Sequence, residues 1–160
     1  MDSFVSIGRN MMIADKYFRM YLRDCLQPYN MNAAEGTVLL MMYRSTMNAD
    51  TNTGSNSGHT QDELIRELHY DKGVMTRTMK ELENKGYVER VTNPSDSRSF
   101  LFTVTQKGSE FRETLFGILK QWNSMLLDGI SIDILSAAEK ALEKMAKNAS
   151  AFYSRQHSQK

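Results

Sequence analysis

Apolar side chains recur every three to four residues near both ends of the chain, which is the spacing of one face of an α-helix. The first such stretch covers residues 4–26 and ends before Pro28, which cannot continue a helix. Two more stretches, residues 106–128 and 131–152, are separated by Gly129. The apolar stripes are wide, so we expect a second copy of the chain to cover them.

The middle of the chain changes its pattern several times. A crowded apolar helix is predicted over residues 33–46. Residues 45–59 are almost wholly Ser, Thr, Asn, Gly and Asp, and they fit neither the helical nor the strand period. We interpret them as a loop insertion at the surface.

Two short helices are predicted after this loop. Thr60 and Glu63 have the spacing of a capping box, which starts a helix that ends near His69. Asp71 is expected to cap the next helix, and Gly86 supplies the left-handed residue at its end. The polar residues at these positions therefore mark where each helix starts and stops.

A β-hairpin is predicted next, with strands at residues 87–92 and 99–105 that are rich in β-branched and aromatic side chains. Two short helices followed by a two-stranded hairpin, or wing, is the order of a winged helix-turn-helix. The expected fold class is therefore mostly α with a small β wing.

The second of the two short helices has two chemically different faces. Its apolar side chains gather on one side, whereas Gly73, Arg77 and Lys80 fall on the opposite side and Thr76 lies beside Arg77. Arginine and lysine can donate to guanine in the DNA major groove. The polar face is thus a candidate DNA-reading surface, and the alternative is an ordinary solvated helix face.

The tip of the predicted hairpin carries Asp96 and Arg98. An arginine that projects from a wing suits the narrow minor groove next to the major groove. Asp96 cannot favour phosphates, so we expect it to accept hydrogen bonds from Arg98 or from turn amides and to keep the tip rigid.

Residues 60–108 resemble the MarR family of bacterial transcription regulators. Two matching motifs lie in and after the wing: Asp-x-Arg at Asp96 and Arg98, and Thr-x-x-Gly at residues 105–108. Two more lie in the second short helix: Thr-Arg at Thr76 and Arg77, and Leu-Glu-x-Lys-Gly at its end, residues 82–86. The family usually has small hydroxyl residues where this chain has Gly73 and Val74, and Val74 is expected to touch a thymine methyl instead.

The resemblance implies a homodimer that binds double-stranded DNA as a transcription regulator, with repression as the usual mode. It implies a helical dimerisation lobe made of residues 1–30 and 106–160, and a winged helix-turn-helix DNA-binding lobe at residues 31–105. Release from DNA by a small-molecule effector or a stress signal is a further expectation. No enzyme motif and no cofactor site is visible, so an enzyme is not expected.

Charge leaves a second function open. The chain of 160 residues has a net charge of +1, and residues 60–108 contain eight Lys or Arg and eight Asp or Glu. Affinity for DNA must then come from the arrangement of charges. The alternative is a winged-helix protein-interaction module that does not bind DNA.

The sequence contains few features that would indicate a redox or metal sensor or a location outside the cytoplasm. The single cysteine, Cys25, lies on the apolar stripe of the first helix and is interpreted as a small buried hydrophobe. The three histidines, His59, His69 and His157, show no metal-ligand spacing. We find no apolar run that would span a membrane and no export signal, so the expected location is the cytoplasm.

Overall fold

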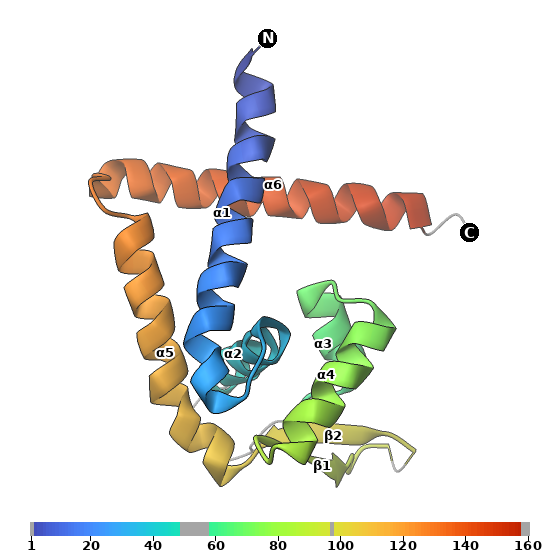
Figure 1. Ribbon diagram of the computed structural model, residues 1–160. Helices are drawn as coiled ribbons and strands as arrows, with labels where there is room; N and C mark the ends of the chain where they lie inside the picture. Colours follow the sequence, from blue (N-terminus) through green and yellow to red (C-terminus); the bar gives the residue numbers. More distant parts are fainter. Residues whose placement is uncertain (1, 49–57, 97, 158–160) are drawn as a thin grey trace. The chain divides into compact units, whose positions relative to one another are not determined.

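The computed structural model describes the backbone of residues 2–48, 58–96 and 98–157, and the side chains of residues 6–44, 58–96 and 98–155. The chain forms two compact units, residues 1–122 and 123–160. In chain order (Figure 1) the elements are α1 (Asp2–Leu26), the short 3-10 helix η1 (Gln27–Tyr29), α2 (Ala33–Asn48), α3 (Gln61–Leu68), α4 (Lys72–Asn84), β1 (Val88–Thr92), β2 (Phe100–Val104), α5 (Gln106–Leu126) and α6 (Ile132–His157).

The predicted fold class is confirmed: the described chain contains six α-helices and one two-stranded antiparallel hairpin. The predicted start of the loop at residue 45 was wrong, because α2 continues to Asn48. Residues 49–57 of that prediction lie outside the described residues. At the far end of the loop, His59 forms an antiparallel bridge with Phe102, so this residue belongs to the wing sheet.

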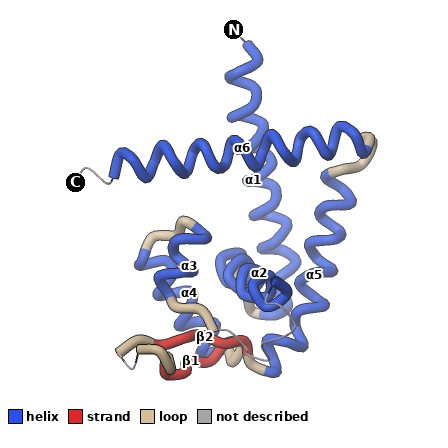
Figure 2. Tube along the Cα trace, turned by 180° about the vertical axis from the view of Figure 1, so that it is seen from behind, coloured by secondary structure: helices blue, strands red, loops and turns tan. Residues whose placement is uncertain are grey.

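Helix α2 forms the centre of the first unit. It contacts α1, α3, α4 and β2. Both Figure 1 and Figure 2 show it between α1 and α5 on one side and α3 and α4 on the other. Val38, Leu39 and Met42 are at most 1% exposed. Their burial supplies much of the apolar area that holds the winged region together.

A buried ion pair joins the start of α2 to the end of α4. Glu35 is fully buried, and its two carboxylate oxygens each accept a hydrogen bond of 2.8 Å from the Lys85 ammonium. Glu35 also accepts from the backbone N–H of Asn32 at 2.9 Å, and Asn32 accepts from the backbone N–H of Glu35 at 3.0 Å. The carboxylate is thereby both paired and hydrogen-bonded, which a buried charge requires.

Within the first unit, α5 packs against α1 and α2 through aromatic rings and hydrogen bonds. Trp122 lies 5.3 Å from the ring of Phe18 and 5.3 Å from the ring of Tyr21 on α1. On α2, the hydroxyl of Tyr43 donates to the carbonyl of Gly108 at 2.5 Å. Burial raises the pKa of Tyr43, so this hydroxyl remains a donor.

The second unit consists mainly of α6, which follows a turn at Gly129 with a φ of 74°. The predicted apolar stripe of this helix is present but uncovered in the single chain: Leu142 is 49% exposed and Phe152 is 65% exposed. None of the buried core side chains among the described residues comes from α6. Within the described ranges no helix combines the length and apolar character needed to cross a bilayer.

We expect Lys85→Met to lower the free energy of unfolding by about 3 kcal/mol, because removing one partner of a buried pair leaves the other charge uncompensated. The measurement is urea unfolding at one fixed protein concentration, since association changes apparent stability.

The matched control is Lys147→Met. Lys147 also pairs with a carboxylate, that of Glu143, but both side chains are more than 60% exposed. This variant should unfold like the wild type. Equal unfolding midpoints for Lys85→Met and Lys147→Met would contradict a stabilising role for the buried pair.

Candidate nucleic-acid interface

Side-chain caps fix the beginnings of α3 and α4. The hydroxyl of Thr60 accepts from the backbone N–H of Glu63 at 3.2 Å, and the carboxylate of Glu63 accepts from the backbone N–H of Thr60 at 2.8 Å. This second bond holds the pKa of Glu63 below its usual value. Asp71 accepts from the backbone N–H of Val74 at 2.8 Å. Both predicted caps are therefore confirmed.

Helix α4 separates its two faces as its sequence predicted. The buried side contains Met75, Met79, Leu82 and Thr78, the last of which the apolar pattern did not reveal. The exposed side carries all the candidate residues of this helix: Gly73, Val74, Thr76, Arg77 and Lys80. No ion pair of Arg77 or Lys80 is found in the described part of the chain, so both charges are available to a partner.

Gly73 leaves room for the side-chain cap at the start of α4. A Cβ at this position would lie 3.2 Å from the Asp71 carboxylate oxygen that caps the helix. Next to it, Val74 is an exposed apolar side chain, 39% accessible. The side chains at this end of α4 are thus small and partly apolar. Arg77 follows one turn later and Lys80 about two turns later.

Thr76 does not present a free hydroxyl donor. Its hydroxyl donates to the carbonyl of Lys72 at 2.8 Å and accepts from the side-chain amide of Gln61 at 2.7 Å. The sequence-based prediction treated Thr76 as a contact in its own right and did not include Gln61. The only sequence signal for Gln61 is its place as the first residue of α3, directly after the capping Thr60.

The wing tip is closed by its own hydrogen bonds. Asp96 accepts from the backbone N–H of Arg98 at 3.0 Å, so its predicted role as an acceptor for the turn is confirmed. Asn93 accepts from the backbone N–H of Ser95 and donates to the Ser99 hydroxyl, both at 2.9 Å. Asn93 was missed, although an Asn before a Pro is a known turn signal. Arg98, which follows in this turn, is exposed.

The base of the wing is tied to the end of α4. Gly86, with a φ of 73°, turns the chain from α4 into β1, and its carbonyl accepts from the Thr105 hydroxyl at 2.6 Å. Thr105 also accepts from the backbone N–H of Gly108 at 3.1 Å. A Cβ on Gly108 would lie 2.3 Å from the carbonyl oxygen of Tyr87, so only glycine fits there. The Thr-x-x-Gly motif therefore fixes the wing to α4 and α5.

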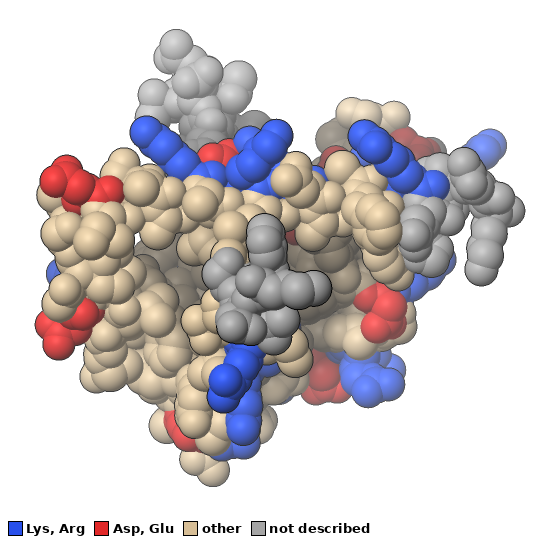
Figure 3. Space-filling view, turned by 90° about the horizontal axis from the view of Figure 1, so that it is seen from above, with Lys and Arg blue, Asp and Glu red and all other residues tan. Residues whose placement is uncertain are grey.

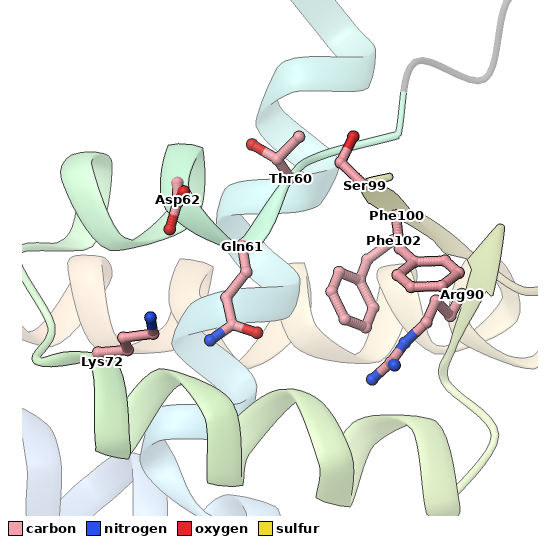
Figure 4. A pocket seen from close by; sticks show the side chains of 8 residues that line it. All are labelled: Thr60, Gln61, Asp62, Lys72, Arg90, Ser99, Phe100 and Phe102. Carbon is pink, nitrogen blue, oxygen red and sulfur yellow. The ribbon is translucent and has the colours of Figure 1, made fainter. Parts of the chain in front are cut away.

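A hollow of about 270 Å³ lies between the start of the α3–α4 pair and the wing. In Figure 4 the side chains of Gln61 and Arg90 point toward α4, and Lys72 lies at the start of that helix. The Arg90 guanidinium lies 5.3 Å from the centres of the Phe100 and Phe102 rings. Residues of both α4 and the wing thus line one surface, and Lys72 and Arg90 are cations that the sequence did not single out.

Charged side chains of both signs lie on the face of the molecule drawn in Figure 3. On the face drawn in Figure 3, blue lysine and arginine side chains are scattered among acidic and uncharged ones. Among the described side chains, no three His, Cys, Asp or Glu residues come together as a metal site. Cys25 is partly exposed in the single chain, less buried than its apolar stripe suggested. The features that stand out are therefore the polar side of α4 and the arginine-tipped wing.

Comparison with known proteins matches this geometry to one family. The model of the MarR family matches residues 51–99. The transcriptional regulator BilQ of Clostridioides difficile is 34% identical over 109 residues, which cover 68% of this chain and just under two thirds of BilQ, 66%. The multiple antibiotic resistance protein MarR of Escherichia coli is 26% identical over 145 residues, 90% of this chain and 93% of that protein.

The structural comparison extends over almost the whole chain. The crystal structure of a mutant of the E. coli MarR complexed with operator DNA aligns with a TM-score of 0.71 and 26% identity. The alignment covers 91% of this chain and 99% of that one. The sequence motifs, the capped α3–α4 pair and the wing agree with these matches: the chain belongs to the MarR family.

Proposed function

We propose that this chain is a homodimeric, sequence-specific transcription regulator that binds double-stranded DNA through α4 and the wing. One observation carries the proposal. Arg77 and Lys80, which form no ion pair with any described residue, lie on the exposed side of α4, and Arg98 lies at the tip of a wing that is tied to the end of that helix. A rigid pair of this kind can reach a major groove and the adjacent minor groove at once.

The exposed residues of α4 take different roles in this proposal. Arg77 and Lys80 donate to guanine edges or to phosphates in the major groove. Gly73 allows close approach of the helix start, and Val74 packs against a thymine methyl. Thr76 supports this surface from the flank of the helix.

In the wing, Arg98 enters the minor groove. Asp96 supports it by accepting the backbone N–H of Arg98 at 3.0 Å, which fixes the course of the tip. The narrow minor groove concentrates negative potential, so a single arginine held there contributes more than a mobile one on a helix surface.

Dimerisation accounts for the uncovered apolar stripes. In the proposed dimer, residues 1–30 and 106–160 of two chains form a helical lobe, and residues 31–105 of each chain form a winged lobe. Exposed apolar side chains at both ends of the chain support this division, among them Met12 at 74%, Ile132 at 78% and Phe152 at 65% exposure. Two winged lobes would then read half-sites about 34 Å apart, one turn of DNA.

We further propose that the protein acts by binding and not by catalysis, as a repressor released by a small ligand or a stress signal. The family membership supports this mode. Occupying a promoter excludes other proteins from the same DNA, so binding alone is sufficient for repression. A regulator has to share a compartment with its operator, and we therefore place this one in the cytoplasm.

Salt dependence distinguishes DNA binding from the alternative, a winged-helix module that binds only proteins. We expect the logarithm of the DNA association constant to fall linearly with the logarithm of the salt concentration, because cations on the protein release counterions from phosphates. Lys80→Ala should reduce the slope by about 1 if Lys80 contacts a phosphate. Fluorescence anisotropy with duplex DNA at several salt concentrations measures both. Failure of the wild type to bind duplex DNA at low salt would favour the protein-interaction module.

Removing the wing arginine should weaken operator binding without affecting the fold. We expect Arg98→Ala to cost about 1 to 3 kcal/mol of binding free energy, and to leave the fold intact because Arg98 is exposed and its side chain makes no hydrogen bond to the described residues of the tip. A gel shift against DNA selected from fragments of the source genome measures it. Lys120→Ala, an exposed cation on α5, serves as the control. Unchanged binding by folded Arg98→Ala would remove the wing from the interface.

Placing a charge on the apolar stripe of α6 should dissociate the dimer. Phe152→Glu puts a carboxylate where the proposed interface is apolar, and a buried unpaired charge is unfavourable. Sedimentation velocity should show a shift from dimer to monomer. Lys140→Glu changes the opposite side of the same helix and should leave the dimer intact. A dimer that tolerates Phe152→Glu as well as Lys140→Glu would argue against this face.

A further inference from the structure

We propose that Gln61 donates a hydrogen bond to a backbone phosphate of the operator, and that Thr76 is the positioning residue that holds Gln61 in place. This inference rests on the proposed function and adds a contact from α3 to the predicted interface. It also changes the role of Thr76, which then acts on DNA through Gln61 and does not contact DNA itself.

The hydrogen bonds of Thr76 limit what its hydroxyl can do. A hydroxyl has one proton to donate and two lone pairs to accept with. The proton of Thr76 is directed to the carbonyl of Lys72 at 2.8 Å, and one lone pair receives the amide of Gln61 at 2.7 Å. Phosphate oxygens and the purine N7 atoms are acceptors, which need a donor. Thr76 can therefore serve them only by giving up its bond to the helix backbone.

Gln61 has hydrogen-bonding capacity left over. A glutamine amide carries two N–H donors and one acceptor oxygen. One N–H of Gln61 goes to Thr76, and the described residues show no bond for the second N–H or for the oxygen. The bond across α3 and α4 restricts the side chain to one direction, so less entropy is lost when the second N–H finds a partner. In Figure 4 the amide is directed toward α4, at the hollow in front of the wing.

The surroundings of Gln61 favour a phosphate over a base edge. The first helix of a helix-turn-helix crosses the DNA backbone while the second lies in the groove, and Gln61 is the first residue of α3. Lys72 and Arg90 line the same hollow and attract an anion. Two carboxylates moderate this attraction: Asp62 also lines the hollow, and Glu83 lies 3.5 Å from the Arg90 guanidinium. The positive and negative charges around Gln61 are therefore equal in number, and a neutral N–H donor can bind a phosphate there without adding a further charge.

The experiment measures DNA affinity for Gln61→Ala, Thr76→Val, Thr76→Ser and the double variant Gln61→Ala/Thr76→Val. Gln61→Ala should weaken operator binding by about 2- to 10-fold, the value of one hydrogen bond. The salt slope should stay unchanged, because a neutral side chain releases no counterion. Thr76→Val, which removes the hydroxyl at constant size, should give a similar loss, and Thr76→Ser should restore wild-type affinity.

The double variant tests the positioning role. If Thr76 acts through Gln61, the double variant should bind no more weakly than Gln61→Ala alone, so the two losses are not additive. Urea unfolding of each variant separates loss of binding from loss of structure. Gln106→Ala is the matched control: Gln106 is the first residue of α5, its amide contacts Glu110, and its removal should not change affinity.

Each remaining outcome overturns a defined part of the proposal. Wild-type affinity in folded Gln61→Ala removes Gln61 from the interface, and additive losses remove the positioning role of Thr76. A loss confined to operators with one particular base pair would show that Gln61 reads a base edge and not a phosphate. If the wild type binds no duplex at low salt, the proposed function itself fails, which is a separate result from any of these.

Discussion

The buried pair of Glu35 and Lys85 is the interaction on which the winged region depends. It connects the first turn of α2, the central helix, to the C-terminal end of α4, and the same carboxylate completes the cap that Asn32 makes on α2. The apolar side of α4 is buried by its own pattern, but apolar packing is nondirectional. The charged pair, with two bonds of 2.8 Å, adds a directional link that fixes the C-terminal end of α4 against the start of α2.

Local sequence was sufficient for the features that involve near neighbours along the chain. The caps at Thr60 and Asp71 and the acceptor role of Asp96 each join residues two or three positions apart. The two faces of α4 followed from its period, because an amphipathic helix has to bury its apolar side. The MarR family followed from motifs that combine such local features.

Contacts between distant residues could not be predicted from the same patterns. Glu35 and Lys85 are 50 positions apart, and Gln61 and Thr76 are 15 apart. His59 pairs with Phe102 in an isolated β-bridge, although the residues around His59 show no alternation of apolar and polar side chains that would predict a strand. Each of these pairs exists only after the helices have packed, so propensity and periodicity carry no information about it. The DNA-binding roles of the exposed residues on α4 and the wing remain predictions.

Gly108 gives the wing a mechanical property. Its backbone is pressed against the Tyr87 carbonyl, its N–H is held by Thr105, and its own carbonyl is held by Tyr43 of α2. Three segments therefore meet at one residue without room for a side chain between them. The base of the hairpin is thereby coupled to both α2 and the first turn of α5. A shift of that turn would be transmitted to the hairpin and so to Arg98 at its tip.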